Sequence, residues 1–136
     1  MSTRPILHIS TVFISEMIEH AHAEQPNECC GLLVGRIVDG DYFAEMRLPL
    51  VNALQSPTRF ESEPRSMMDA WKQIRASKLE VLAVYHSHPS SPPIPSATDL
   101  ANNHWGETVA CVIVSGNEVR GWWLTEFRYQ EAEIRD

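Results

Sequence analysis

Two short runs of consecutive apolar residues, residues 81–85 (VLAVY) and residues 109–114 (VACVIV), constrain the fold of this chain more than any other feature. A strand without polar residues on either face has to be covered on both faces, as the central strands of layered α/β proteins are. Residues 29–38 (CCGLLVGRIV) also read as a buried strand. The chain therefore predicts a sheet with these strands in its interior and helices packed over it.

Amphipathic stretches supply the helices. Residues 11–24 carry apolar side chains at positions i, i+3, i+4 and i+7 from Ile14, and Ser10 is suited to cap this helix. A second helix is expected to begin near Pro64, where proline is tolerated, and a short third helix over residues 97–104. The apolar residues of the second helix that we expect to be buried are Met67, Trp71 and Ile74.

Turn-forming residues set the order of the elements. Residues 39–41 (DGD) predict a hairpin into a returning strand over residues 42–51, in which Pro49 marks a fraying end or an edge. A second turn at residues 115–117 leads into a strand over residues 119–125. The resulting order, α-β-β-α-β-α-β-β, predicts a mixed sheet flanked by helices in a single domain over residues 1–136; the tail after the last strand is left unassigned.

Composition narrows the partners and the compartment. Eleven Lys and Arg against eighteen Asp and Glu give a formal net charge of −7, which disfavours nucleic acid and anionic membrane surfaces as partners. There is no apolar run of a membrane span's length and no signal-peptide pattern. Cys29, Cys30 and Cys111 cannot form an even disulfide set and lack CxxC spacing, so we expect reduced core thiols in a cytoplasmic protein.

Residues 85–99 (YHSHPSSPPIPSATD) carry the chemistry. His86 and His88 stand at i and i+2 at the end of a strand, so their side chains point to one face. Imidazole nitrogen is a common zinc ligand, and Asp99 is the candidate for a third ligand. Three protein ligands leave a fourth position for water, as in catalytic zinc sites. Two exposed histidines at a strand end would give the same HxH pattern.

Hydrolysis also needs a proton carrier and a group that stabilises negative charge. Glu28 can take a proton from water and hand it to the leaving amine, and Ser96 can donate a hydrogen bond to the developing oxyanion. Both residues have a structural alternative. Residues 96–99 (SATD) also fit a capping box at a helix start, and Glu28 can be a solvated loop carboxylate.

Taken together, the spacing resembles a known family. His86-x-His88, seven residues, Ser96, two residues and Asp99, with the upstream Glu28, resemble the JAMM (MPN-plus) zinc metalloprotease motif without a gap or substitution. The resemblance implies a cytidine-deaminase-like α/β/α sandwich, the JAMM/MPN fold. It also implies one Zn²⁺ per chain held by the two histidines and the aspartate, Glu28 as general acid/base, and Ser96 stabilising the tetrahedral intermediate.

The same resemblance implies a substrate. Family members hydrolyse the amide bond after the C-terminal Gly-Gly of ubiquitin-like proteins, and this near-minimal chain is similar to the compact prokaryotic branch that acts on sulfur-carrier proteins. Residues 52–60 (NALQSPTRF) resemble the N-x-x-x-S-P-x-x-F/Y segment of that branch, which makes Ser56 and Phe60 candidates for the substrate groove; a plain structural loop is the alternative.

Two other functions compete with this one. The first is a deubiquitinase-like isopeptidase of broader specificity. The second is a catalytically silent MPN interaction scaffold, but such scaffolds lack one or more metal-binding residues, whereas this chain has them all.

The remaining histidines and the paired tryptophans have plainer interpretations. We expect His20 and His22 to be solvated on the first helix and His104 to lie at a helix end. Trp122 and Trp123 alternate faces on the last strand, so we expect one in the core and the other exposed or at an interface, where it would permit a homodimer.

Overall fold

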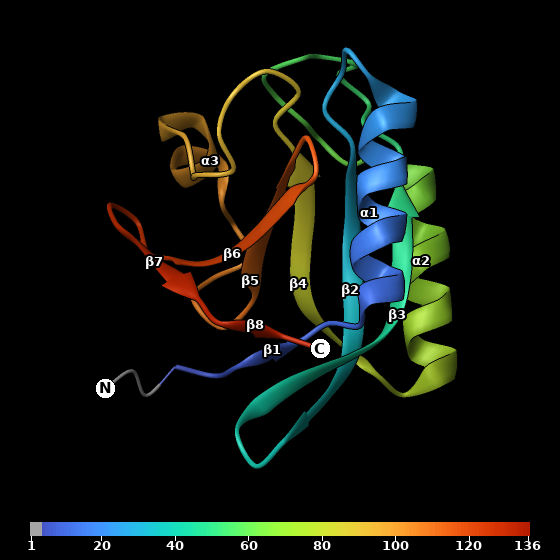
Figure 1. Ribbon diagram of the computed structural model, residues 1–136. Coiled ribbons are helices and arrows are strands. Elements are labelled where there is room, and N and C mark those ends of the chain that lie inside the picture. The colour runs from blue at the N-terminus through green and yellow to red at the C-terminus, as the bar shows by residue number, and fades with distance from the viewer. Residues whose placement is uncertain (1–3) are drawn as a thin grey trace.

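The computed structural model, which describes residues 4–136, contains an eight-stranded mixed sheet with helices on both faces (Figure 1). The strand order is β7-β6-β5-β4-β2-β3-β1-β8. The strands are β1 (Leu7–His8), β2 (Cys30–Val38), β3 (Asp41–Leu50), β4 (Glu80–Ser87), β5 (Ala110–Ser115), β6 (Glu118–Leu124), β7 (Tyr129–Ala132) and β8 (Ile134–Arg135). The helices are α1 (Thr11–Glu24), α2 (Pro64–Ser77) and α3 (Ala97–Asn102).

Alternating side chains on the central strands divide the core into two layers. In β2, Leu33 belongs to the layer that contains Met17 of α1, whereas Leu32 and Val34 belong to the layer that contains Ile74 of α2. Each large apolar side chain buried in this way contributes about 1.5–3 kcal/mol. The continuous apolar runs of the sequence are therefore explained, because both faces of these strands are covered.

The position of β4 determines where the candidate site lies. β4 pairs antiparallel with β2 and parallel with β5, and His86 lies opposite Cys30 on one side and Ile113 on the other. The carboxyl end of β4 therefore lies beside the beginning of β2. Helix α3 packs through Leu100 against Ile113, on the sheet face opposite α1.

Most predicted elements are confirmed. Ser10 caps α1, and Pro64 occupies the first turn of α2. Asp39 and Gly40 both have positive φ, 51° and 86°, as a tight two-residue hairpin turn between twisted strands requires. At Pro49 the outer edge of β3 is free of β1, because the β3 residues that pair with β1 are Tyr42 and Phe43. Among residues 4–136, no helix combines the length and the apolar character needed to cross a membrane.

Two predictions about tryptophans are wrong. Trp71 is 40% exposed, and Ala70 takes its place between Met67 and Ile74 on the buried face of α2. Trp122 and Trp123 are both buried, because the outer face of β6 is covered by the chain itself. Trp122 Nε1 donates to Pro93 O (2.9 Å) and its ring packs edge-on against Tyr129, so it offers no surface for self-association.

Three short strands had no sequence signal. β1 has two residues and pairs in parallel with both β3 and β8, while β7 extends the other end of the sheet beside β6.

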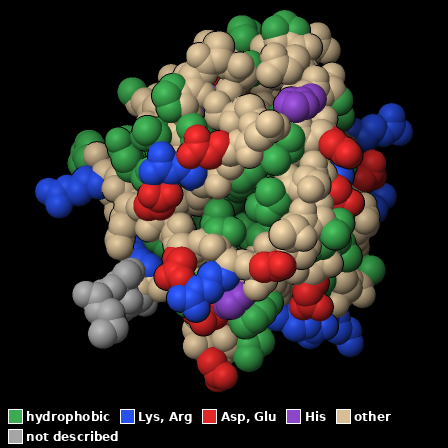
Figure 2. Space-filling view, viewed as in Figure 1, with side chains coloured by type: hydrophobic (Ala, Val, Ile, Leu, Met, Phe, Trp, Pro, Cys, Tyr) green, Lys and Arg blue, Asp and Glu red, His purple; other side chains and the backbone are tan. Residues whose placement is uncertain are grey.

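On the face shown in Figure 2, Lys and Arg side chains are dispersed among Asp and Glu. Cys29 and Cys30 are buried as predicted, Cys111 is partly exposed, and all three thiols are free.

Gly35 lies where the register between β2 and β3 shifts, and a Cβ there would lie 1.9 Å from Phe43 O. We expect Gly35→Ala to lower the free energy of unfolding by at least about 1–3 kcal/mol, because a backbone oxygen cannot rotate away as a side chain can. Urea denaturation measures the change. Val38→Ala, at the exposed end of the same strand, is the control and should cost less than about 1 kcal/mol. Equal costs would contradict this account of Gly35.

Candidate metal centre

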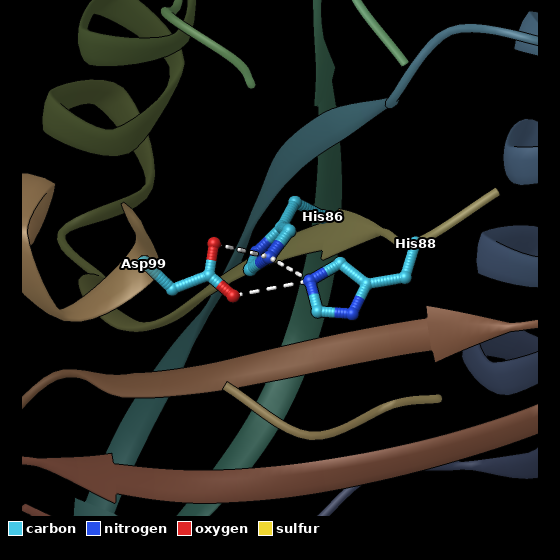
Figure 3. Close-up of side chains that lie close together, drawn as sticks. All are labelled: His86, His88 and Asp99. Carbon is cyan, nitrogen blue, oxygen red and sulfur yellow. Dashed lines mark hydrogen bonds and ion pairs between the residues drawn. The ribbon is translucent and has the colours of Figure 1, made fainter. Parts of the chain in front are cut away.

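Three side chains that can bind a metal meet at the carboxyl end of β4 (Figure 3). His86 and His88 project from the strand end, and Asp99 reaches them from α3. The two histidine Nε2 atoms are 3.2 Å apart. Asp99 Oδ1 lies 3.2 Å from His86 Nε2, and its Oδ2 lies 3.0 Å from His88 Nε2. The three candidate ligands of the sequence thus form one compact group.

Hydrogen bonds from neighbouring strands fix this end of β4. Ser87 N donates to Cys29 O (3.1 Å), and Ser87 Oγ accepts from Cys29 N (2.8 Å). On the other side, His88 N donates to Val114 O (2.8 Å). The backbone stays extended through both histidines, so the two rings share a face and Ser87 points away from them. The same contacts bring Glu28, the residue before Cys29, to the site.

The proline-rich loop orients one of the two imidazoles. His88 Nδ1 lies 2.7 Å from Pro92 O. A carbonyl oxygen only accepts hydrogen bonds, so Nδ1 carries the hydrogen and, in the neutral ring, Nε2 presents its lone pair towards the other ligands. A hydrogen bond to the second ring nitrogen is the usual way in which proteins orient metal-binding histidines.

Ser96 and Asp99 form the capping box that the sequence allowed. Ser96 Oγ accepts from Asp99 N (3.1 Å), and Asp99 Oδ2 accepts from Ser96 N (2.9 Å). The cap does not compete with the ligand arrangement, because Oδ2 also faces His88 and Oδ1 faces His86. The Ser96 hydroxyl uses a lone pair in the cap and keeps its hydrogen to donate elsewhere.

The ionisation of these groups follows from their packing. Burial alone would raise the pKa of Asp99, but hydrogen bonds from His86 and His88 outweigh it and hold that pKa well below its usual range. Burial alone would lower the pKa of His88, yet its hydrogen bonds to Asp99 and to Pro92 O raise the pKa overall. The aspartate is therefore an anion that attracts positive charge to this position.

Glu28 is a buried carboxyl without that compensation. It is 3% exposed, and no hydrogen-bond partner within residues 4–136 lies near its Oε1. Burial raises its pKa to about 8, with His88 opposing the shift and Asp99 adding to it. The alternative of a solvated loop carboxylate is therefore wrong. A carboxyl with a pKa near neutrality can both accept and release a proton under ordinary conditions.

The donor set fits a zinc ion. Tetrahedral zinc with nitrogen and oxygen ligands places its donor atoms about 3.3 Å apart, close to the separations found here. Three protein donors leave one position open. The group of possible metal ligands among the described residues contains neither neighbouring thiol, and burial raises the pKa of Cys29 to about 11 and that of Cys30 to about 12.

A cavity of about 470 Å³ opens beside the three ligands, over the sheet face that α2 and α3 share. His86 and Asp99 form part of its wall, and its apolar lining includes Leu32, Val84 and Trp105. His104 is exposed on its rim near the end of α3, where the sequence placed it.

The two candidate substrate residues lie differently. Phe60 lines the cavity and stacks on the His86 ring, with centroids 4.7 Å apart and planes inclined by 23°. Ser56 is not part of the cavity lining; its carbonyl oxygen accepts from Glu28 N (2.8 Å), and its hydroxyl accepts from Thr58 N (3.2 Å). The structure thus brings Phe60 to the ligands and ties Ser56 to the backbone of Glu28.

One prediction about histidines fails away from the centre. His20 is half-buried, because its Nδ1 lies 2.7 Å from the hydroxyl of Tyr85, which also accepts from Arg47 Nη1 (2.9 Å). His22 is exposed as predicted. Sequence reasoning gave no role to Asn52 or to Pro92, whose contacts hold the site together; only the resemblance of residues 52–60 to a family segment marked the former.

This fold, with an HxH pair at a strand end and an aspartate at the following helix start, defines a protein of the JAB/MPN class. The model of prokaryotic homologues of the JAB domain matches residues 10–125, and the chain belongs to that family. The architecture agrees with a solved structure, that of a protein from Desulfitobacterium hafniense, which is 32% identical and superimposes with a TM-score of 0.86 over 96% of this chain and 92% of the other.

Two curated relatives are similar in sequence. One is the probable TtuB-protein conjugate cleaving protease of Thermus thermophilus, 33% identical over 122 residues that cover 89% of this chain and 78% of the relative. Another is the CysO-cysteine peptidase of Mycobacterium tuberculosis, 30% identical over 95 residues. That match covers 70% of this chain but 64% of the relative, slightly less than two thirds of its length.

The raised pKa of Glu28 generates a prediction about stability. In the metal-free chain the folded state keeps the Glu28 proton up to a pH of about 8, whereas the unfolded state loses it near the usual carboxyl value. The folded state therefore loses stability relative to the unfolded state as pH rises between those two values. We expect Glu28→Gln to be more stable than wild type, by up to a few kcal/mol at pH 8 and by much less at pH 5.

Urea denaturation of chelator-treated protein at the two pH values measures this difference. Glu126→Gln replaces an exposed carboxyl and is the matched control. A Glu28→Gln difference that is equal at both pH values would show that Glu28 is ionised in the fold.

Proposed function

We propose that this chain is a zinc-dependent peptidase or isopeptidase that cleaves the amide bond after the C-terminal Gly-Gly of a ubiquitin-like or sulfur-carrier protein. One observation carries the proposal: the possible ligand atoms of His86, His88 and Asp99 lie within 4.8 Å of one another, beside Glu28. Glu28 is a buried carboxyl whose Oε1 has no partner among residues 4–136. A scaffold function would not require a buried carboxyl that lacks a hydrogen-bond partner beside a complete set of metal-binding residues. Family membership and relatives named as proteases support the enzymatic interpretation.

Each residue of the proposed site has a defined task. His86, His88 and Asp99 hold one Zn²⁺ through Nε2, Nε2 and a carboxylate oxygen. When bound, zinc supplies Lewis acidity, which polarises a carbonyl and acidifies water. Glu28 accepts a proton on its carboxylate and delivers it to the leaving nitrogen, since a pKa near neutrality suits both transfers.

Ser96 completes the mechanism. Its hydroxyl is fixed by the hydrogen bond from Asp99 N and keeps its own hydrogen for the oxygen that becomes negatively charged when the carbonyl is attacked. The capping box is then the device that positions the hydroxyl rather than an alternative to the catalytic role. Ser96 Oγ serves both tasks, because a lone pair accepts the hydrogen bond of the cap while the hydroxyl hydrogen remains available to the oxyanion.

The substrate class is inferred from the relatives and from the shape of the site. The relatives are named for cleaving a TtuB conjugate and a CysO–cysteine compound, which suggests a small carrier protein as partner. A Gly-Gly tail is narrow enough to lie extended beside His86 and the Phe60 ring, and Ser56 contributes by holding the backbone of Glu28 through its carbonyl oxygen. Three free thiols fit a reducing compartment, so we place the enzyme in the cytoplasm.

The direct test is cleavage of a carrier protein fused through Gly-Gly to a short peptide, followed by intact-mass analysis with and without a zinc chelator. We expect chelator-sensitive cleavage immediately after the second glycine. Cleavage of lysine-linked ubiquitin chains at a similar rate would instead favour the broader isopeptidase. Absence of both cleavage and zinc from the folded protein would favour a scaffold.

Two substitutions separate metal binding from proton transfer. We expect Glu28→Gln to retain one zinc per chain and to lower kcat by about 10²–10⁴-fold, because the amide cannot carry the proton. His88→Ala should lose zinc as well as activity, because one of three ligands is gone. Elemental analysis of the purified proteins and single-turnover cleavage measure the two effects. An active Glu28→Gln protein, or a fully metallated and active His88→Ala protein, would remove that residue from the mechanism.

The Phe60 ring stacked on His86 predicts discrimination at the tail. We expect a fusion with an Ala-Ala tail to be cleaved with a kcat/KM about 10-fold or more below that of the Gly-Gly fusion, because each added methyl group has to fit beside the Phe60 ring. Phe60→Ala should reduce this ratio while Trp71→Ala, an exposed aromatic outside the cavity lining, should leave it unchanged. Equal cleavage of both tails by wild type would contradict a steric basis for selectivity.

A further inference from the structure

Asn52 is a buried polar side chain whose hydrogen-bonding capacity is fully used. It is 9% exposed. Its Nδ2 donates to Glu28 O and to Arg59 O, both at 3.0 Å. Its Oδ1 accepts from Leu54 N and from Glu61 N, both at 3.1 Å. Two donors and two acceptors on one amide account for every strong hydrogen bond that asparagine can make, so the side chain has one orientation here.

These contacts connect the loop over residues 52–62 to the backbone of Glu28. Asn52 Nδ2 holds the carbonyl of Glu28, while Ser56 O accepts from the amide of the same residue (2.8 Å). Both backbone polar groups of Glu28 are therefore bonded to a single loop. The carboxyl group, in contrast, has an oxygen with no partner among residues 4–136, so its position is set through its backbone.

The other two contacts of Asn52 determine where Phe60 lies. The amide binds Arg59 O and Glu61 N, the backbone groups on either side of Phe60. The ring between them stacks on His86 at 4.7 Å. An isolated bridge between Asn52 and Ser62 closes the base of the loop. One amide thus connects two parts of the centre, the backbone that carries Glu28 and the ring that covers His86.

We propose that Asn52 is a positioning residue for the reaction, which holds Glu28 and Phe60 in fixed relation across the metal centre through its four hydrogen bonds. The inference rests on the proposed function, in which Glu28 transfers the proton. A buried amide that served only to shape the loop would need its bonds to Leu54, Arg59 and Glu61; the bond to Glu28 O adds nothing to the loop itself. That bond instead fixes the position of the loop relative to the backbone of Glu28.

Two variants separate these contributions. Asn52→Asp keeps the oxygen that accepts from Leu54 and Glu61, so the loop bonds on that side persist, but it removes both donated bonds, including the one to Glu28. Asn52→Ala removes all four bonds and carries no buried charge. Asn117→Ala, at an exposed turn, is the matched asparagine control.

For both Asn52 variants we expect kcat for the Gly-Gly fusion to fall about 10–100-fold, with KM changed by less than about 3-fold and one zinc per chain retained. Amide hydrogen exchange of the Glu28 N–H should accelerate by about 10-fold, because its bond to Ser56 O loses the neighbouring restraint. Asn117→Ala should change neither quantity. All rates are measured well below the melting temperature of each variant.

The proposal is overturned if kcat stays within about 3-fold of wild type, or if Glu28 exchange is unchanged while exchange at Leu54 and Glu61 accelerates. The second result would assign Asn52 to loop structure alone. If wild type cleaves none of the substrates, the proposed function fails, and exchange at Glu28 still decides whether Asn52 holds its backbone.

Discussion

The reciprocal pair of hydrogen bonds between Ser87 and Cys29 is the contact on which the rest of the site depends. Ser87 N donates to Cys29 O and Ser87 Oγ accepts from Cys29 N, which fixes the end of β4 against the residue that follows Glu28. Extended backbone alternates its side chains, so with Ser87 turned towards Cys29 the flanking histidines share the opposite face. This contact joins residues that are 58 positions apart in the sequence and thereby brings Glu28 to the end of β4.

The burial of several ionisable side chains at this centre lowers the stability of the fold. Two imidazoles and two carboxyls are buried in this region, and of the two carboxyls Asp99 is the one that the histidines compensate by hydrogen bonds. Among residues 4–136 one oxygen of Glu28 has no partner, and its pKa is raised, which costs the fold stability wherever the solution pH favours the ionised form. The two-layer core offsets this cost and holds the Glu28 carboxyl in its buried position.

The sequence predicted most of the central sheet and the grouping of His86, His88 and Asp99, because both depend on local patterns. Apolar runs mark strands covered on two faces, and an HxH pair needs only the alternation of one strand. What it missed depends on distant contacts: the strands β1, β7 and β8 are short and exist through pairing, and Trp122 is buried by a proline loop 29 residues away. Asn52 escaped for the same reason, since its partners come from two segments.

The closed loop over residues 52–62 has a fixed base, which positions Glu28 and Phe60, and an exposed outer part that can change without moving them. Its base is fixed by the bridge between Asn52 and Ser62 and by the bonds of Asn52, whereas Pro57 and Thr58 are exposed at its outer part. Lengthening a loop whose ends are held costs little, because closure entropy grows only slowly with length. Residues inserted in that outer part would therefore change the exposed surface of the loop while Glu28 and Phe60 keep their positions.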